Sequence, residues 1–316
     1  MLDTIAIGDT LPVFERTTDF PEWNRYAAVN DEFIDVHMSA DWAQAAGQRD
    51  VFGMGNLRVG YLHCALYDWL DGRGDIASFS CQFRQLNWRQ DRLATHATIT
   101  GVVEVDGLQV VNLAVGVVNQ NGEETTPGTA QVVLFDPAAG PRMPAEPARA
   151  AIPTRDPGVY LDDATIGWLG KPLAPLPSLP IDANDIRRWA QAEYYPDAPP
   201  PALFDADAAR DGPWGELVAP RDFNPFAWNP DHHPEAYPWM RGMGTEPGYR
   251  GLNGGQSNWY FAPMRVSDVV TADVTLIDAF EKEGKVGTMM FLVDETRLTN
   301  QRGELVRITH RVSIYS

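Results

Sequence analysis

The sequence predicts an α+β protein made of two antiparallel β-meanders, the first of which wraps around one long helix. Three observations lead to this prediction. Residues 92–105 and 270–276 alternate apolar with polar side chains, a period of two that is typical of strands with one buried face. Matched polar motifs recur in the two halves of the chain. One segment, residues 55–70, is apolar on nearly every side.

The matched motifs indicate an internal duplication. Asp91, in QDRLATHATITGVVEV, corresponds to Asp268, in SDVVTADVTLIDAFEK. Each is followed by an Asn-Gln-x-Gly-Glu block, at residues 119–123 and 300–304. The spacing is slightly longer in the second half, which a longer hairpin around residues 281–285 explains. We therefore expect one fold to occur twice.

Turn signals and a linker set the boundaries of the two units. Asp106-Gly107, Asn121-Gly122 and Glu283-Gly284 are typical of hairpin turns. Residues 136–157 are rich in Pro and Ala and have no apolar period, which predicts a linker or a surface crossing. The chain is expected to comprise a first unit at 1–135, this linker, and a second unit at 158–316.

The segment 55–70 reads GNLRVGYLHCALYDWL. A helix that is apolar nearly all round must be buried, and a long helix wrapped by an antiparallel sheet is the hot-dog arrangement. The counterpart region in the second half, 224–250, holds five prolines, which forbid a long helix. We expect a shortened or broken helix there and a concave sheet open to a bulky apolar ligand. The candidates to line it are Trp228, Tyr237 and Trp239.

Composition excludes several classes of function. The net charge of −18 argues against nucleic-acid binding, which needs clustered Lys and Arg. Two cysteines are too few for a disulfide scaffold. We see no secretory signal and no run approaching the ~18 apolar residues of a membrane helix. The sequence therefore predicts a cytoplasmic protein without a membrane span.

A cluster of acids before one histidine could carry chemistry. Asp31, Glu32 and Asp35 precede His37, directly before the predicted buried helix. A carboxylate and an imidazole together can orient a water molecule and pass its protons. The plainer alternative is a solvated acidic loop with an incidental histidine. The apolar residues interleaved with the acids would anchor the segment to the core, which favours the first interpretation.

The predicted helix begins with Phe52-Gly53-Met54-Gly55-Asn56. A helix N-terminus presents unpaired N–H groups and partial positive charge. The N–H of Gly55, with no side chain to block approach, could hold a carbonyl oxygen whose charge grows during a reaction. The alternative is a glycine turn that only caps the helix.

These features together resemble the MaoC-like, R-specific enoyl-CoA hydratases, whose usual motif is Gly-Asp-x-Asn-Pro-(aliphatic)-His. Here Glu32 stands at the Asp spacing, Ile34 replaces Asn and Asp35 replaces Pro. With one inserted residue in the loop, Asp31 is the acid instead. The string EFIDVH is closer to the Asp-Phe-x-Asp-Val-His string of the MaoC-like hydratase subunit of steroid side-chain breakdown. That alignment makes Glu32 the acid.

The second half resembles the dehydratase N-terminal-type hot dog through GLNGGQSNWYFAPMRVSDVV and ETRLTNQRGELV. In that family this half is usually non-catalytic and holds the acyl tail. It usually precedes the catalytic half, whereas here it follows. The resemblance therefore implies a double hot-dog chain whose first unit does the chemistry.

The resemblance implies a hydro-lyase that adds water to, or removes it from, the 2,3 double bond of an acyl-CoA thioester, with a bulky or branched acyl group. His37 and Glu32 (or Asp31) would bind the water, and the Gly55 N–H would hold the thioester oxygen. It implies no metal and no organic cofactor. The rivals are an acyl-CoA thioesterase and a non-catalytic acyl-binding subunit of a hydratase complex. The sequence does not determine the acyl group, its carrier or the direction of reaction. It also does not determine whether two double hot-dog chains form a homodimer.

Coenzyme A carries several negative charges, so a local basic patch is expected despite the acidic chain. The candidates are Arg84, Arg89 and Arg92 around the first long strand, and Arg58 on the helix. The alternative is ordinary surface arginines in weak ion pairs. Asp231-His232-His233 lacks the ligand spacing of a zinc site and is expected to be a surface loop.

Overall fold

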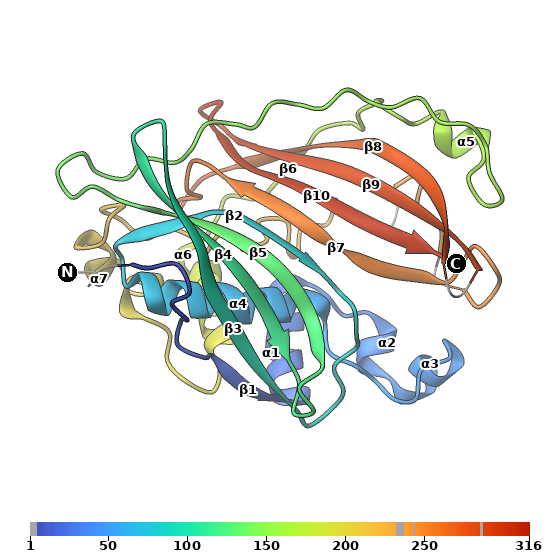
Figure 1. Cartoon of the computed structure of the whole chain (residues 1–316), viewed down its shortest axis with the longest axis horizontal. Coiled ribbons are helices and arrows are strands. Elements are labelled where there is room, and N and C mark those ends of the chain that lie inside the picture. The colour runs from blue at the N-terminus through green and yellow to red at the C-terminus, as the bar shows by residue number, and fades with distance from the viewer. Residues whose placement is uncertain (1–4, 232–236, 243, 285–286) are drawn as a thin grey trace.

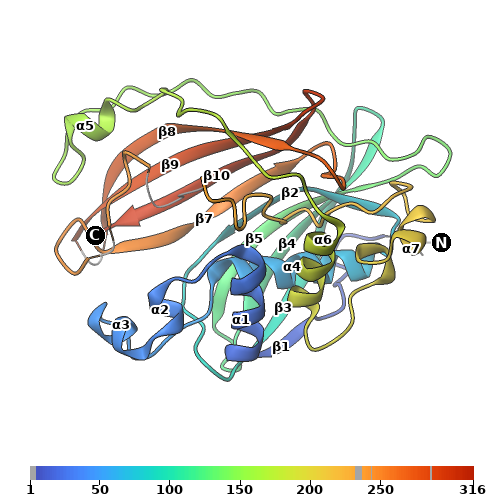
Figure 2. The same ribbon diagram turned by 180° about the vertical axis from the view of Figure 1, so that it is seen from behind.

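The computed structural model describes residues 5–231, 237–242, 244–284 and 287–316. One antiparallel ten-stranded sheet runs through both halves in the order β1-β3-β4-β5-β2-β7-β10-β9-β8-β6. Figures 1 and 2 show the sheet curving over the helices of the first half, with the main helix α4 lying under its strands. The predicted α+β class with two meanders is confirmed.

In its described residues, from residue 5 onward, the first half contributes five strands and four helices. The meander consists of β3, β4 and β5. Strand β3 pairs with β4 from Ala94↔Val118 to Val105↔Leu108, and β4 pairs with β5 from Gln109↔Leu134 to Val118↔Glu124. The elements are β1 (Glu15–Thr18), α1 (Phe20–Asn30), α2 (Asp35–Met38), α3 (Ala40–Ala45), α4 (Gly55–Leu70), β2 (Gly74–Gln82), β3 (Asp91–Val105), β4 (Leu108–Val118) and β5 (Glu124–Leu134).

The second half repeats the meander with β8, β9 and β10. Before it come short helices and one longer helix, α6, which lies beside α1 and α4 of the first half (Figure 2). The elements are α5 (Asp163–Ile166), β6 (Leu176–Pro177), α6 (Ala183–Tyr194), the 3₁₀ turn η1 (Pro201–Leu203), α7 (Ala206–Arg210), β7 (Gly251–Tyr260), β8 (Val270–Gly284), β9 (Gly287–Asn300) and β10 (Leu305–Tyr315).

The two halves join where β2 pairs with β7, from Ser78↔Trp259 to Gln82↔Gly255. The hydroxyls of Ser80 and Ser257 lie 2.8 Å apart across this seam. Because the strands are antiparallel and occupy the same place in each half, the seam relates the two units as a pseudo-dimer.

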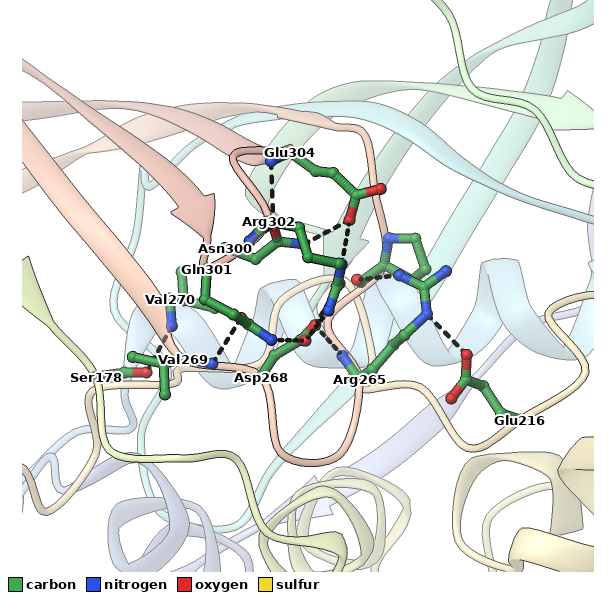
Figure 3. Close-up of polar contacts among 11 residues, drawn as sticks. Ser178, Glu216, Arg265, Asp268, Val269, Val270, Asn300, Gln301, Arg302 and Glu304 are labelled. Atoms are coloured by element: carbon green, nitrogen blue, oxygen red, sulfur yellow. Dashed lines mark hydrogen bonds and ion pairs between the residues drawn. The ribbon is translucent and has the colours of Figure 1, made fainter.

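The duplicated motifs make the same hydrogen bonds in both halves. Gln120 Nε2 donates to Asp91 Oδ1 at 2.8 Å, and Gln301 Nε2 donates to Asp268 Oδ1 at 2.9 Å. Figure 3 shows the second copy, in which Arg302 also contacts Asp268. The side-chain amides of Asn119 and Asn300 likewise donate to the glutamate four residues later and accept from its backbone N–H. The motifs tie each hairpin loop to the start of its meander.

Turn chemistry follows the predicted residues. Asp106 (φ 52°) and Gly107 (φ 72°) both adopt left-handed conformations, as a tight type I′ hairpin needs. Gly122 (φ 75°) closes the next hairpin. The predicted hairpin around 281–285 joins β8 to β9, but residues 285–286 lie outside the described residues.

Helix α4 forms the centre of the core, as expected for the first unit. Residues 57–66 of this helix are all buried, including Arg58 and His63 among the apolar side chains. In the second half, the described parts of 224–250 contain turns and no helix. The indole of Trp239 is fully buried there, 5.4 Å from the ring of Tyr237 and 6.1 Å from that of Trp168.

The linker 136–157 has no helix and no named strand. It crosses the second half of the sheet near β8 (Figure 1). Ion pairs hold it to strand residues: Arg149 with Glu295 at 2.7 Å, and Arg155 with Asp278 at 2.8 Å. None of the helices among the described residues has both the length and the apolar character that a membrane crossing requires.

Candidate active site

Helix α1 ends immediately before the acidic cluster. A capping box between Asp19 and Glu22 opens it, and Asp31 closes it in the left-handed region (φ 53°, ψ 41°). Aspartate is one of the few non-glycine residues that visit this region readily. Asp31 thus occupies the position at which the resembled motif has glycine, and the chain reverses direction just before Glu32.

Glu32 is half-buried beside the start of α4. Its Oε2 accepts a 2.7 Å hydrogen bond from Asn30 Nδ2, and the side chain of Asn56 also hydrogen-bonds to the carboxyl group. Burial raises the pKa of Glu32 to about 7, and these two amides offset part of that rise. The carboxyl group can therefore hold or release a proton near neutral pH.

His37 lies on the short helix α2 and is 7% exposed. Its Nδ1 is 2.8 Å from the carbonyl oxygen of Phe52. Since a carbonyl oxygen only accepts hydrogen bonds, Nδ1 carries the proton and Nε2 keeps its lone pair. Burial lowers the pKa of His37, while the bond to Phe52 acts in the opposite direction. The neutral ring is thus fixed in one tautomer.

Helix α4 begins at Gly55 without a side-chain cap, because its N-cap residue is Met54. The first N–H groups of a helix have no partner within it and carry partial positive charge. A Cβ at position 55 would lie 3.1 Å from the ring of Phe83. Glycine therefore keeps the helix start open beside that ring.

The two titratable side chains are attached on either side of Gly55. His37 is bound to Phe52, three residues before it, and Glu32 is bound to Asn56, one residue after it. The structure thus brings three of the predicted residues, Glu32, His37 and Gly55, to one helix end. This arrangement attaches a base and an acid to the helix start that carries a hydrogen-bond donor, and such a combination suits a proton transfer next to a polarised carbonyl.

The side chain of Asp31 lies near Trp228 and not at the start of α4. It is exposed, and its Oδ2 lies 3.4 Å from the backbone nitrogen of Trp228. The sequence left Asp31 and Glu32 as alternatives, and of the two it is Glu32 whose carboxyl group hydrogen-bonds to Asn56 at the start of α4. Asn56 was missed as a functional candidate, although its position next to Gly55 in the glycine turn was a usable signal.

One of the predicted phosphate-binding arginines needs correction. Arg58 is 2% exposed, and its Nη1 donates to the carbonyl oxygens of Gln85 and Thr125. Burial lowers the pKa of Arg58 to about 10. A side chain enclosed in this way holds the loop at Gln85 to the start of β5 and cannot reach an exposed phosphate group.

The other three arginines are exposed. Arg84 and Arg89 lie on the loop between β2 and β3, and Arg92 is near the start of β3. Arg89 lies 3.5 Å from Asp50, and Arg92 lies 3.9 Å from Glu15. Exposed pairs at such distances contribute little and can exchange for another anion. Arg49, which the sequence analysis missed, lies over the ring of Trp88 on the same loop.

The three aromatic candidates do not form one surface. Trp228 is 60% exposed, donates from Nε1 to the carbonyl oxygen of Ala28 and lies 6.0 Å from Phe33. Tyr237 and Trp239 pack on each other instead. His232 and His233 fall outside the described residues. Among those that are described, no three His, Cys, Asp or Glu side chains are grouped as metal ligands would be.

Comparison with solved structures decides the fold. A MaoC domain protein from Chloroflexus aurantiacus superposes with a TM-score of 0.68 at 13% identity, over 98% of this chain and 95% of that one. A protein of Mycobacterium tuberculosis with a double hot-dog fold superposes with a TM-score of 0.62 at 13% identity, over 99% and 97%. This chain is a double hot-dog protein.

Residues 167–309 of this double hot-dog protein match the family model of the FAS1-like dehydratase domain region. A MaoC-like dehydratase also superposes, with a TM-score of 0.62 at 13% identity over 97% of each chain. A search of curated proteins finds no match. The resemblance to MaoC-like dehydratases is confirmed at the level of the fold, and the family match supports a function of the hydratase–dehydratase type. The matched region is the half that does not contain His37 and Glu32.

Proposed function

We propose that this double hot-dog protein is a hydro-lyase that adds water to the 2,3 double bond of an acyl-CoA thioester, or catalyses the reverse dehydration. The observation that carries the proposal is the attachment of His37 to Phe52 and of Glu32 to Asn56, on the two sides of Gly55. The acid, the base and the helix N-terminus then face the same reacting group.

The protonation states of the two side chains assign the proton transfers. His37 is neutral with a free Nε2, so it accepts a proton from water. The pKa of Glu32 is about 7, so a large fraction is protonated at neutral pH and can deliver a proton to carbon 2. The water oxygen bonds to carbon 3 as its O–H bond breaks. Proton return from His37 to Glu32 restores the starting state.

The start of α4 stabilises the intermediate charge. As water adds, negative charge grows on the thioester oxygen, which becomes enolate-like. The N–H of Gly55 donates to this oxygen, and the partial positive charge of the helix end adds to the effect. Because a Cβ at position 55 would lie only 3.1 Å from the Phe83 ring, glycine is the residue that lets a thioester approach this helix end most closely. This chemistry needs neither a metal nor an organic cofactor.

The remaining parts of the substrate have candidate contacts. Arg84, Arg89 and Arg92 are the exposed cations proposed for the coenzyme A phosphates. The second half of the sheet is proposed to hold the acyl group, because the described parts of 224–250 contain no helix that corresponds to α4. Since two hot-dog units already pair within one chain, a homodimer of double hot-dogs is not needed to complete the site, and it remains a prediction.

The proposal is tested by incubating the wild-type protein with straight, branched and polycyclic enoyl-CoA thioesters. Loss of absorbance at the enoyl-thioester band supports a hydratase. Because hydrolysis of the thioester also removes this band, release of free thiol together with the loss would instead identify an acyl-CoA thioesterase. Binding of the thioesters without turnover would identify a non-catalytic acyl-binding subunit.

A further inference from the structure

A row of polar residues crosses the seam on one face of the sheet. Cys81 of β2 pairs with Gln256 of β7, Gln256 pairs with Arg311 of β10, and Arg311 pairs with Asp294 of β9. Directly paired residues of neighbouring strands project from the same face of a sheet. The four side chains therefore share one face, and the row runs from the first unit into the second.

That face is the inner one, turned toward α4. Phe79, two residues before Cys81 on β2, packs its ring 4.8 Å from the imidazole of His63 on α4. Its partner Asn258 is 4% exposed, and Thr309 Oγ1 donates to Asn258 Oδ1 at 2.7 Å. The neighbouring row of the same face is thus also polar in the second unit.

Arg311 has donor capacity left over. Its Nε donates to Asp294 Oδ2 at 3.2 Å, its Nη2 lies 3.5 Å from the sulfur of Met240, and its guanidinium lies over the ring of Tyr237. A guanidinium has five N–H donors, and a thioether is a weak acceptor. The side chain of Arg311 is 28% exposed, whereas that of Asp294 is 3% exposed. Within the described part of the chain, these contacts leave Nη1 without a hydrogen bond.

An ion pair at this place calls for a role beyond stability. Burying Asp294 beside an arginine carries a desolvation cost that well-packed apolar residues would avoid. The inward residues on one side of Asp294 in β9 are the apolar Met290 and Leu292, and on the other side Thr296 is followed by the buried Leu298. A surface that held only a hydrocarbon tail would gain nothing from Arg311 at its centre.

The row leads directly from the candidate active site. Phe83, whose ring borders Gly55, follows Cys81 by two residues. From Cys81 to Arg311 is two strand spacings, or about 10 Å. An acyl chain whose thioester lies at Gly55 would therefore pass Phe83 and Gln256 before it reaches the guanidinium of Arg311.

We propose that Arg311 binds an oxygen of the acyl group, so that the substrate is an acyl thioester with a keto or hydroxyl group several carbons from the thioester. This inference rests on the proposed function, which places the thioester at Gly55. A neutral oxygen fits better than a carboxylate, because Asp294 already balances the charge of Arg311. Gln256 and Thr309, both partly exposed on the same face, offer further polar contacts to such a chain.

The test compares binding of two series of saturated acyl-CoA thioesters of equal length. One series is plain, and the other carries a single keto group at successive distal carbons. A charged hydrogen bond contributes about 1.5–3 kcal/mol, which is roughly 10- to 100-fold in affinity. We expect the wild-type protein to bind the best keto compound that much more tightly than its plain partner.

The variant R311M/D294N removes both charges together, so that no buried carboxylate is left unpaired. It should lose the preference for the keto compound and keep its affinity for the plain one. R311K retains a cation and should keep part of the preference for the keto compound. This variant therefore tests the role of Arg311 even if the double variant fails to fold. R297Q, which removes an arginine paired with Glu146 of the linker, is the matched control and should bind as wild type does.

Equal affinity of the wild-type protein for both series, absence of binding to either, or a preference that survives in R311M/D294N would overturn the inference. Hydration of the corresponding enoyl-CoA thioesters is measured in parallel. A keto preference without hydration would support the binding role of Arg311 and contradict the proposed hydro-lyase. Hydration without a preference for the keto compound would support the proposed hydro-lyase and contradict the binding role of Arg311.

Discussion

The Nδ1 atom of His37 lies 2.8 Å from the carbonyl oxygen of Phe52, three residues before the start of α4. This contact fixes the tautomer of the imidazole and anchors the ring to the same glycine turn that exposes the N–H of Gly55. Glu32 reaches the other side of that turn through Asn56. The chemistry proposed above therefore depends on local backbone geometry around one helix N-terminus.

The pH dependence of catalysis follows from the two pKa shifts. Glu32 acts as the acid and its pKa is about 7, so hydration should decline as pH rises past 7. His37 must be neutral and its pKa is lowered, so the acid limb should lie below the ordinary histidine value of 6.5. A profile of kcat/KM against pH checks both limbs. An acid limb well above pH 6.5 would contradict the assigned role of His37.

Glu32 should also make stability depend on pH. Its pKa is raised from 4.5 to about 7 on folding, so the native state binds the extra proton between these values. The stabilisation is present below pH 4.5 and is lost as pH rises through 7. E32Q cannot ionise, so its Tm relative to wild type should increase between pH 5 and pH 8. A difference in Tm that stays constant over this range would show that the carboxyl group is not shifted in this way.

Asn56 is expected to be a positioning residue that acts through Glu32. Its hydrogen bond lowers the pKa of Glu32, so N56A should raise that pKa further and move the alkaline limb of the activity profile to higher pH. N30A, which removes the other amide, should move the limb in the same direction. Loss of activity in N56A without a shift of the alkaline limb would indicate that Asn56 supports the local structure and does not act through the pKa of Glu32.

Substitution of Gly55 should impair catalysis more than folding. The Cβ of G55A would lie 3.1 Å from the Phe83 ring, so that the ring or the helix start must shift by a few tenths of an ångström. A misplacement of about 1 Å can lower a rate by roughly 100-fold, so this smaller shift should lower kcat by less than that. The double variant G55A/F83L relieves the contact and should recover part of kcat, as steady-state kinetics would show. Full activity of G55A alone would remove the argument that this helix end must stay open.

The duplicated motifs should contribute similarly to stability. Gln120 and Gln301 make equivalent hydrogen bonds to Asp91 and Asp268, and each bond is worth about 1 kcal/mol. Q120A and Q301A should therefore lower the free energy of unfolding by similar amounts in denaturant titrations. A large effect in only one half would mean that the hairpins are held by different interactions.

Much of the fold was predictable because it depends on local patterns. Period-two alternation located the strands of both meanders, and the glycine turns fixed their hairpins. The all-round apolar character of α4 placed it in the core. The sequence did not reveal that α6 lies beside α1 and α4, because packing between distant segments leaves no local periodicity.

The site was predictable in part for the same reason. Glu32, His37 and Gly55 lie within a short stretch of sequence, so spacing alone could associate them. The choice between Asp31 and Glu32 required the left-handed conformation of Asp31, which turns one carboxylate toward Trp228 and the other toward Asn56. The burial of Arg58 depends on segments around Gln85 and Thr125 that are distant in sequence, and the row that contains Arg311 depends on strand register.

The central claim is that Glu32 and His37, and not Asp31, carry the chemistry. The most direct measurement compares the initial rate of enoyl-CoA hydration by the wild-type protein with the rates of E32Q, H37A and D31N, each shown to be folded by its Tm. General acid–base groups contribute about 10²–10⁴-fold, so E32Q and H37A should each lose that much while D31N stays within a few-fold of wild type. A folded H37A or E32Q with near-wild-type activity, or a D31N as inactive as either, would contradict the account.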